Sequence, residues 1–118
     1  MPSYIVKPDK DVDFYVYWNE VVESPTLWGS REEFLREYPK VEKRDIPDVN
    51  VRMNRADRYG CSALWPSMEA PIYGYKLDDG PVFQQKGSVS RVNLPELCRR
   101  LGLEADPDVS DLLEPFED

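Results

Sequence analysis

The alternation of side chains in residues 13–19 constrains the fold more than any other stretch of the chain. In an extended chain Phe14, Val16 and Trp18 lie on one face, while two tyrosines and an asparagine lie on the other. Large apolar groups on both faces are typical of a central strand that is covered from both sides. We therefore expect the other elements to pack around this strand.

Two shorter strands are predicted beside the central one. Residues 3–7 are β-prone and end at Pro8, and the short charged connection that follows favours antiparallel pairing. Pro25 interrupts the next apolar run, after which residues 26–28 return as a third strand.

Two helices are predicted in the middle of the chain. Ser30 and Glu33 have the spacing of a capping box for the first helix, which Pro39 is expected to end. Asn50 is expected to cap the second helix, and Gly60 to close it in a left-handed conformation. The residues of the second helix expected to point inward are Val51, Met53, Ala56 and Tyr59.

Residues 93–102 carry the clearest helical pattern. Asn93 and Glu96 have the spacing of a second capping box, and Gly102 is expected to stop the helix. Apolar residues recur at positions i, i+3, i+4 and i+7, which places them on one face. This stripe consists of Leu94, Leu97, Cys98 and Leu101.

The order of these elements predicts an α+β fold. We expect a small antiparallel sheet of about five to six short strands, with two to three helices packed on one side. Residues 72–92 are expected to add a small meander with a hairpin turn at residues 78–80. Residues 1–103 are expected to form a single globular α+β domain, on which residues 104–118 dock as an acidic C-terminal segment.

The charge of the chain is distributed unevenly. The formal net charge is −8, yet seven acidic residues and no basic residue follow Leu101, so the rest of the chain is nearly neutral. Such a chain has no long-range attraction for nucleic acid or anionic lipid. We expect its partner to be a basic protein surface, with no direct nucleic-acid binding and no membrane. No apolar stretch approaches the ~20 residues that are needed to span a bilayer.

The chain contains no histidine, which excludes several classes of catalytic and metal site. Ser-His and Cys-His pairs, His-ligated zinc and a histidine general base are all ruled out. Glycine-rich phosphate-binding motifs are absent as well, so no cofactor is expected. Cys61 and Cys98 do not form a disulfide framework, and we expect both as reduced thiols in a cytoplasmic protein.

Four acidic residues are spaced like the ligands of a calcium-binding loop: Asp9, Asp11, Asp13 and Glu20. That loop requires a glycine at its sixth position, where this chain has Phe14. If the following residues are extended, Asp13 and Glu20 lie ~23 Å apart and cannot bind one ion. We therefore favour a solvated acidic turn and expect no metal.

Arg52, Arg55 and Arg58 form the main basic concentration of the chain. They are candidates to contact an anion or a carboxylate of a partner. A solvated face of the second helix, paired with nearby acids, is the favoured interpretation, because exposed charges are common.

The C-terminal segment mixes acidic and apolar residues and is the main candidate for a binding site. Its apolar residues suit a groove and its carboxylates suit a basic rim on a partner. Docking of the segment on its own domain, with the acids left as a negative face, is an equally good alternative. The candidate partner-binding residues are Glu104, Asp106, Asp108, Asp111, Leu112, Glu114, Phe116 and Glu117.

Four motifs carry a resemblance to a known group of proteins. They are Tyr-Ile-Val-Lys-Pro at 4–8, Tyr-Val-Tyr-Trp at 15–18, Ser-Pro-Thr-Leu-Trp-Gly-Ser-Arg-Glu-Glu at 24–33 and Arg-Ala-Asp-Arg-Tyr-Gly-Cys-Ser at 55–62. In these motifs the chain resembles small acidic, uncharacterised proteins of actinobacteria and their phages. The resemblance implies a bacterial cytoplasm and brings no activity, substrate or catalytic residue.

These observations favour a non-enzymatic interaction module that binds a basic protein through its C-terminal acidic face, in the manner of an inhibitor or immunity protein or in a phage-related role. One alternative is a small carboxylate-dependent enzyme with a pocket near Asp57, Arg58 and Trp65. Another is a structural or dimeric component that associates through Tyr73, Tyr75 and Phe83, although we favour a monomer.

Overall fold

The centre of the molecule is an antiparallel sheet whose middle strand is the one predicted from the alternation of its side chains. The structure is a computed structural model and describes residues 3–9, 11–19, 21–41, 47–62 and 82–114. The strands of the central sheet follow the order β1 (Ser3–Val6), β2 (Tyr15–Asn19) and β3 (Ser24–Gly29).

Strand β2 separates two apolar cores. Val16 and Trp18 face one core, to which the partly buried Phe14 also packs. Tyr15 and Tyr17 face the other core. The prediction of a central strand covered on both faces is therefore confirmed.

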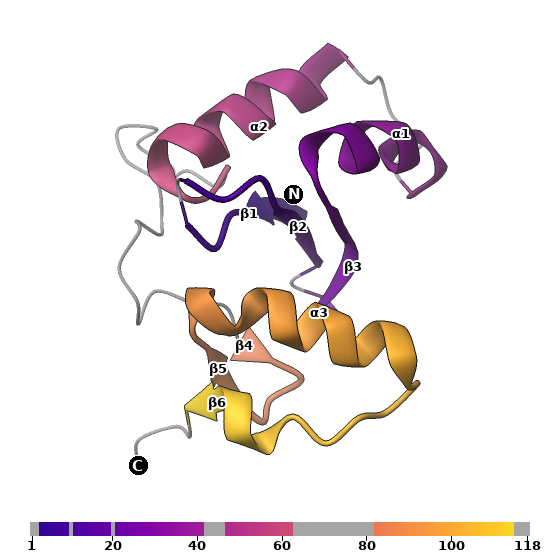
Figure 1. Cartoon of the computed structure of the whole chain (residues 1–118), viewed down its shortest axis with the longest axis vertical. Helices are drawn as coiled ribbons and strands as arrows, with labels where there is room; N and C mark the ends of the chain where they lie inside the picture. Colours follow the sequence, from indigo (N-terminus) through magenta and orange to yellow (C-terminus); the bar gives the residue numbers. More distant parts are fainter. Residues whose placement is uncertain (1–2, 10, 20, 42–46, 63–81, 115–118) are drawn as a thin grey trace.

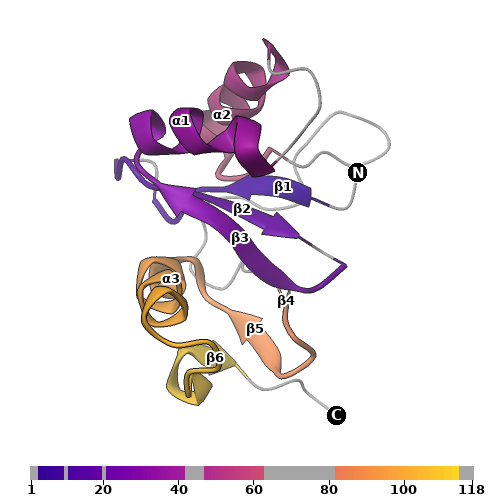
Figure 2. The same cartoon turned by 90° about the vertical axis from the view of Figure 1, so that its right-hand side faces the viewer.

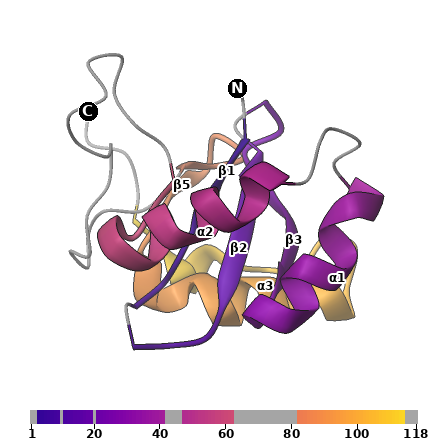
Figure 3. The ribbon, with the colours of Figure 1, turned by 90° about the horizontal axis from the view of Figure 1, so that it is seen from above.

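Helices α1 (Arg31–Val41) and α2 (Pro47–Tyr59) cover one face of this sheet, as Figure 3 shows from above. Between the helices and the sheet, the ring of Phe34 stacks on Tyr38 at 5.7 Å and meets Tyr17 edge-on at 6.2 Å. We call this the α1/α2 core, and its buried residues are Ile5, Tyr15, Tyr17, Phe34, Tyr38, Val49, Met53 and Ala56.

The opposite face of the central sheet is covered by the C-terminal half of the chain (Figures 1 and 2). A second antiparallel sheet has the order β4 (Val82–Phe83), β5 (Gly87–Val89) and β6 (Leu113–Glu114). Between β5 and β6 the chain forms η1 (Arg91–Asn93), α3 (Leu94–Leu103) and η2 (Ser110–Leu112). We call this the α3 core, and its buried residues are Tyr4, Val6, Val16, Trp18, Cys61, Phe83, Val89, Leu94, Leu97, Cys98, Val109 and Leu112.

This architecture confirms the α+β class, with six strands and three helices in the described part of the chain. Helices α1 and α2 share one side of the central sheet, as expected, whereas α3 lies on the other side (Figure 2). The strands also form two small sheets rather than one. Both features follow from β2, because each of its apolar faces must be buried against another layer.

The predicted start of α1 is confirmed by a reciprocal capping box. The Glu33 N–H donates to Ser30 Oγ at 3.2 Å, and the Ser30 N–H donates to Glu33 Oε1 at 3.0 Å. The expected end at Pro39 is wrong, because the helix continues to Val41. Pro39 lies in the last turn, where the loss of one backbone hydrogen bond does not prevent a final helical residue.

The expected cap of α2 at Asn50 is wrong. The helix begins at Pro47, a residue whose fixed φ suits the first helical position, and Asn50 lies within the helix. The expectation that Val51 points inward is also wrong: it is exposed, because it lies two residues, or about 200°, around the helix from the buried Met53. The buried residues of the helix include Val49, Met53 and Ala56. The end of the helix at Gly60 is as predicted, with φ at +89°.

Helix α3 is confirmed, but its predicted capping box does not form. The side chain of Asn93 makes no capping hydrogen bond, because the η1 turn leads directly into the helix. Glu96 instead pairs with arginines of the next turn. Gly102 does not stop the helix, which runs to Leu103. Leu94, Leu97 and Cys98 are buried, as the apolar stripe predicted.

Candidate functional site

Residues 104–114 fold back along α3 and do not extend into solvent (Figure 1). Two of their apolar side chains, Val109 and Leu112, are buried in the α3 core. Strand β6 pairs with β5, placing Leu113 opposite Val89 and Glu114 opposite Ser88. Within the described residues, the C-terminal segment is therefore part of the folded domain.

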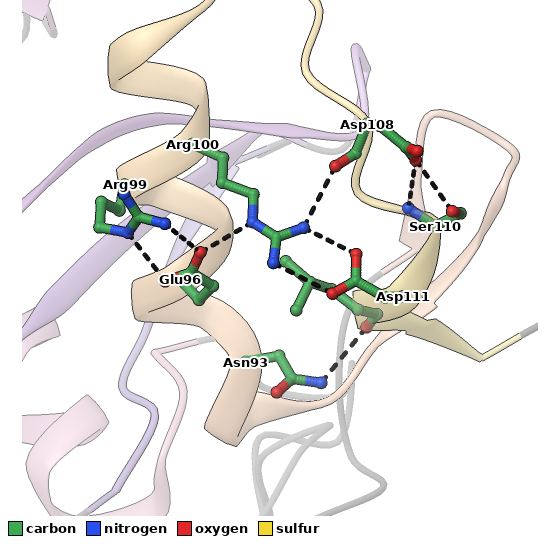
Figure 4. A network of polar contacts seen from close by, with 8 residues as sticks. Asn93, Glu96, Arg99, Arg100, Asp108, Ser110 and Asp111 are labelled. Atoms are coloured by element: carbon green, nitrogen blue, oxygen red, sulfur yellow. Dashed lines mark hydrogen bonds and ion pairs between the residues drawn. The ribbon is translucent and has the colours of Figure 1, made fainter.

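A network of ion pairs joins this segment to α3 (Figure 4). The guanidinium of Arg100 donates to both carboxylate oxygens of Asp111, at 2.7 and 3.0 Å, and to the carbonyl oxygen of Asp108 at 3.1 Å. Its Nε donates to Glu96 at 2.7 Å, and Arg99 donates to the same carboxylate at 2.6 Å. A bidentate arginine–carboxylate pair fixes orientation as well as distance. Arg100 therefore sets the position of the η2 turn.

The carboxylates of this network remain ionised well into the acid range. Hydrogen bonds from Arg99 and Arg100 lower the pKa of Glu96 to about 2. The hydrogen bonds from Arg100 likewise lower the pKa of Asp111. Both groups are therefore anions near neutral pH, although each is partly neutralised by its arginine partner.

A local turn holds the chain between α3 and η2. Asp108 Oδ1 accepts hydrogen bonds from the Ser110 N–H at 3.1 Å and from Ser110 Oγ at 2.8 Å. These bonds lower the pKa of Asp108. Asn93 Nδ2 also donates to the Leu112 carbonyl at 3.4 Å, which connects the start of α3 to η2 (Figure 4).

Gly87 allows the close approach of β6 to β5. A Cβ atom at this position would lie only 2.5 Å from the carbonyl oxygen of Glu114 and 3.3 Å from the Leu113 Cβ. Any larger residue at position 87 must therefore displace the C-terminal strand.

A hollow of about 520 Å³ lies between the C-terminal segment and the turn that joins β4 to β5. The turn is held by the Gln84 N–H, which donates to the Glu23 carbonyl at 3.0 Å. Lys86 in this turn supplies a cation at the rim, while Asp106 and Asp108 supply anions from the other side. The remaining lining residues are Pro107, Val109, Ser110 and Leu113. We call this hollow the C-terminal groove.

The structure separates the predicted binding residues into different roles. Glu104, Asp106 and Glu114 are exposed. Asp108 is exposed but also caps Ser110, and Asp111 is bound by Arg100. The expectation of Leu112 as an accessible apolar anchor is wrong, because its side chain is 8% exposed within the α3 core. Phe116 and Glu117 lie outside the described residues.

The expected arginine face of α2 is wrong for Arg52. This side chain is only 7% exposed, donates to the Tyr38 hydroxyl at 2.8 Å and lies over the Tyr17 ring at 5.4 Å. Arg52 therefore contributes to the α1/α2 core, because an arginine stem and guanidinium pack well on aromatic rings. Arg55 is half-buried and Arg58 is exposed, and their contact with an anion stays a prediction.

A cluster of charged residues around Asp57 was not predicted. Lys7 Nζ donates to Asp57 Oδ1 at 2.8 Å, and the Tyr15 hydroxyl donates to the same oxygen. Arg31 Nη1 donates to Asp57 Oδ2 at 3.0 Å. The alternation of residues 3–7 contained one signal, because it places Lys7 on the same face as the buried Ile5.

The Asp57 carboxyl is ionised in this cluster. Burial raises its pKa, but hydrogen bonds from Lys7 and Tyr15 and the charges of Lys7 and Arg31 outweigh this effect and lower the pKa overall. Burial also lowers the Lys7 pKa, whereas its bond to Asp57 and the nearby anionic groups raise it overall. A carboxyl with a lowered pKa is not suited to donate a proton near neutral pH. Trp65, which was grouped with Asp57, lies outside the described residues.

The acids of the predicted calcium loop have local structural roles. Asp9 Oδ1 accepts the Asp11 N–H at 3.0 Å, and Asp13 Oδ1 accepts the Arg31 N–H at 2.9 Å at the start of α1. Glu20 lies outside the described residues. Within the described ranges, no group of three or more Cys, Asp or Glu side chains is arranged to hold a metal ion.

Both cysteines are buried free thiols. Burial in the α3 core raises the pKa of Cys98 to about 12, which keeps this thiol protonated and unreactive. Tyr73 and Tyr75 of the predicted dimer interface lie outside the described residues, and Phe83 is buried in the α3 core.

Among the described residues, no helix combines the length and apolar character needed to cross a bilayer. Comparison of the chain with protein-family models, curated proteins and solved structures gives no match.

Proposed function

We propose that this protein is a non-enzymatic interaction module that binds a basic segment of another protein at the C-terminal groove. The observation that carries the proposal is the fixed position of residues 108–114. Arg100 of α3 and strand β5 hold these residues, while Asp106 and Asp108 line a hollow together with apolar residues. A preformed site of this kind loses little conformational entropy on binding.

The acidic residues at this face fall into two groups, those that are bound to arginines and those that are exposed to a partner. Asp111 and Glu96 are bound to arginines and support the fold. Glu104, Asp106 and Glu114 are exposed, and they surround the segment with negative charge available to a partner. Because paired charges are already neutralised, the second group supplies the attraction for lysine or arginine side chains.

The walls of the groove favour a partner segment that is mixed rather than purely basic. Pro107 and Leu113 are half-buried and present apolar surface beside the acids. Lys86 lies at the rim, so a dense cluster of positive charge is disfavoured there. We infer that the bound segment combines one or two basic residues with an apolar residue.

We also propose a cytoplasmic location in a bacterium or its phage, with an inhibitor or immunity role as the sharper version of the function. The location is supported by the two free thiols at residues 61 and 98. The inhibitor role is supported by an anionic face that suits a basic surface.

Charge-neutral substitutions at the proposed face test the function. The triple variant Glu104→Gln, Asp106→Asn and Glu114→Gln is compared with a control of equal charge change, Asp9→Asn, Asp11→Asn and Asp13→Asn, whose side-chain oxygens can still accept hydrogen bonds. All six positions are exposed. The probe is a library of labelled hexapeptides that contain two lysines or arginines and one leucine, measured by fluorescence anisotropy at 25 and 300 mM NaCl.

We expect the peptides that bind to lose about tenfold in affinity with the triple variant, at roughly 0.5 kcal/mol for each exposed carboxylate. Binding is also expected to weaken at high salt, because exposed charges are screened. The control variant should retain its affinity within about twofold. An equal loss in both variants would show an effect of net charge alone and would reject the C-terminal groove as the site.

A further inference from the structure

Among the described residues, the central sheet has one edge that bonds to another segment of the chain and one edge, the open edge, that pairs with no further strand. At the β1 edge, the Ile5 N–H donates to Ser62 Oγ and the Ser62 N–H donates to the Ile5 carbonyl, both at 2.8 Å. The Lys7 N–H donates to the Gly60 carbonyl at 2.9 Å. At the other edge, β3 pairs only with β2 within the described residues. Figure 2 looks onto β3, and no described element lies in front of it.

The hydrogen bonds of β1 establish which groups of β3 face outward. Because the Ile5 groups point away from β2, the alternation of an antiparallel ladder directs Val16 and Trp18 of β2 toward β1. The backbone groups of Tyr17 consequently point toward β3, where its carbonyl also accepts Thr26 Oγ1 at 3.3 Å. Leu27, which pairs with Tyr17, therefore faces β2, and the N–H and C=O of Trp28 face the open edge.

Proline and a bulge limit how much of this edge can pair. Pro25 has no N–H to offer, and the register of β3 shifts opposite Tyr17 and Trp18. These are devices by which edge strands resist pairing with other chains. The available donor and acceptor are thus concentrated at Trp28, near the end of β3.

Apolar side chains gather beside these open backbone groups. Trp28 is half-buried, and its ring lies 3.6 Å from the position of a Cβ added at Gly102 of α3. The next residue, Leu103, is 70% exposed and lies on the helix face that carries Arg99 and Arg100. An exposed leucine therefore directly follows the residue of α3 that approaches the Trp28 ring.

The charges near this edge select the kind of partner. Glu32 in the first turn of α1 and Glu104 directly after α3 are exposed, and neither forms an ion pair with a described residue. Glu32 lies four residues after Trp28 in the layer of α1, and Glu104 lies two residues after Gly102 in the opposite layer (Figure 2). A second copy of this chain would bring the same acids and another net charge of −8 to the edge, which opposes self-pairing.

We propose that the edge of β3 at Trp28 binds an extended segment of a basic partner protein by strand addition. The partner's backbone pairs with the N–H and C=O of Trp28, an apolar side chain contacts Leu103, and basic side chains face Glu32 and Glu104. This inference rests on the proposed function and specifies how the partner docks. Strand addition of this type uses backbone hydrogen bonds for affinity and neighbouring side chains for specificity.

Two synthetic peptides of equal charge test the backbone pairing. The probe is acetyl-(Lys-Val)₃-amide, and its control is acetyl-(Lys-Pro)₃-amide, which cannot donate from alternate positions. Amide hydrogen exchange is measured by NMR with each peptide. We expect the first peptide to slow exchange of the Trp28 amide by about tenfold, because a free edge N–H becomes hydrogen-bonded. The control peptide should leave that rate unchanged.

A matched pair of variants tests the apolar contact. Leu103→Ser removes the exposed leucine beside the edge, whereas Val51→Ser removes an exposed valine from α2, where 53% of the residue is accessible. We expect Leu103→Ser to weaken the first peptide about fivefold, as for partial burial of one leucine. Val51→Ser should have no effect on its affinity.

Each other outcome overturns the inference. Binding with exchange protection confined to residues 106–113 would place the partner in the C-terminal groove alone, so the proposed function would survive without strand addition. Protection of Trp28 without peptide, together with a dimer in sedimentation equilibrium, would assign the edge to a second copy. Absence of binding at millimolar peptide would reject strand addition outright.

Discussion

Ion clusters stabilise both sides of the central sheet, but they connect very different parts of the chain. The Asp57 cluster joins residues separated by 50, 42 and 26 positions. It links α1 and α2 to β2 and to Lys7, the residue that follows β1. The Arg100 cluster joins residues separated by 4 and 11 positions and connects α3 to the η2 turn of the C-terminal segment. The first cluster therefore belongs to the global fold, whereas the second fixes one local segment.

Burial explains why the two clusters should respond differently to substitution. Lys7 is 6% exposed, so the loss of its partner leaves a charge that solvent cannot easily stabilise. Arg99 and Asp111 are exposed, and water replaces a lost partner there at small cost. Loss of the Asp57 cluster is therefore expected to destabilise the whole fold. Loss of the Arg100 cluster is expected to release only the C-terminal segment.

The largest effect is expected from the two cores themselves. Phe34→Ala in the α1/α2 core should lower the free energy of unfolding by ~3–5 kcal/mol, and Leu97→Ala in the α3 core by ~2–5 kcal/mol. Because both cores share β2, urea denaturation should show one transition in each variant. Two separate transitions, followed by tryptophan fluorescence and circular dichroism, would show that the layers unfold independently.

The Asp57 cluster is expected to have the next largest effect. Asp57→Asn keeps the shape of the side chain but leaves Lys7 and Arg31 without their anion. We expect a loss of about 2 kcal/mol, less than for a fully buried pair because the carboxylate is partly exposed. Glu32→Gln, at an exposed position of α1, is the matched control and should change the unfolding free energy by less than ~0.5 kcal/mol. An equal loss of unfolding free energy in both variants would show that Asp57 stabilises the fold no more than an exposed carboxylate does.

Gly87→Ala tests whether the pairing of β6 with β5 stabilises only the C-terminal segment or the whole fold. The added Cβ would collide with the Glu114 carbonyl, so we expect a cost of ~1–2 kcal/mol and displacement of β6. Hydrogen exchange should increase near Val109 and Leu112, while the amides of β2 stay protected. The control is Gly102→Ala, where an added Cβ makes ordinary contact with Trp28. Faster exchange throughout β2 would instead show that the segment is essential to the global fold.

The smallest effect is expected from acid titration of the Arg100 cluster. The pKa of Glu96 is lowered from its ordinary value of 4.5 to about 2, so its stabilising contribution is present above pH 4.5 and disappears as the pH falls toward 2. NMR titration of the Glu96 carboxyl should give this low pKa. In the variant Arg99→Gln, Arg100→Gln, the pKa should return toward 4.5. An unchanged pKa in the variant would assign the shift to another cause.

Several features that depend on nearby residues were predictable from the sequence, although the caps expected at Asn50 and Asn93 do not form. The alternation around Trp18, the capping box of Ser30 and Glu33, and the buried stripe of α3 all involve residues within a few positions of one another. Local geometry decides these features, and the fold class followed from their order.

Features that depend on distant residues were not predictable in the same way. Arg52 is turned inward by Tyr38 and Tyr17, which only the folded helices bring near it. Asp57 finds Lys7 only after β1 and α2 meet. At the C-terminal face, the acids were identified as a group, but nothing local separates Asp111, bound to an arginine, from the exposed Asp106.

The bond between Ile5 and Ser62 has a consequence for stoichiometry. Because this flank of the sheet is already bonded by residues 60–62 of the same chain, a strand cannot join at β1 as well as at β3. The central sheet of one molecule therefore has room for one added strand, at β3.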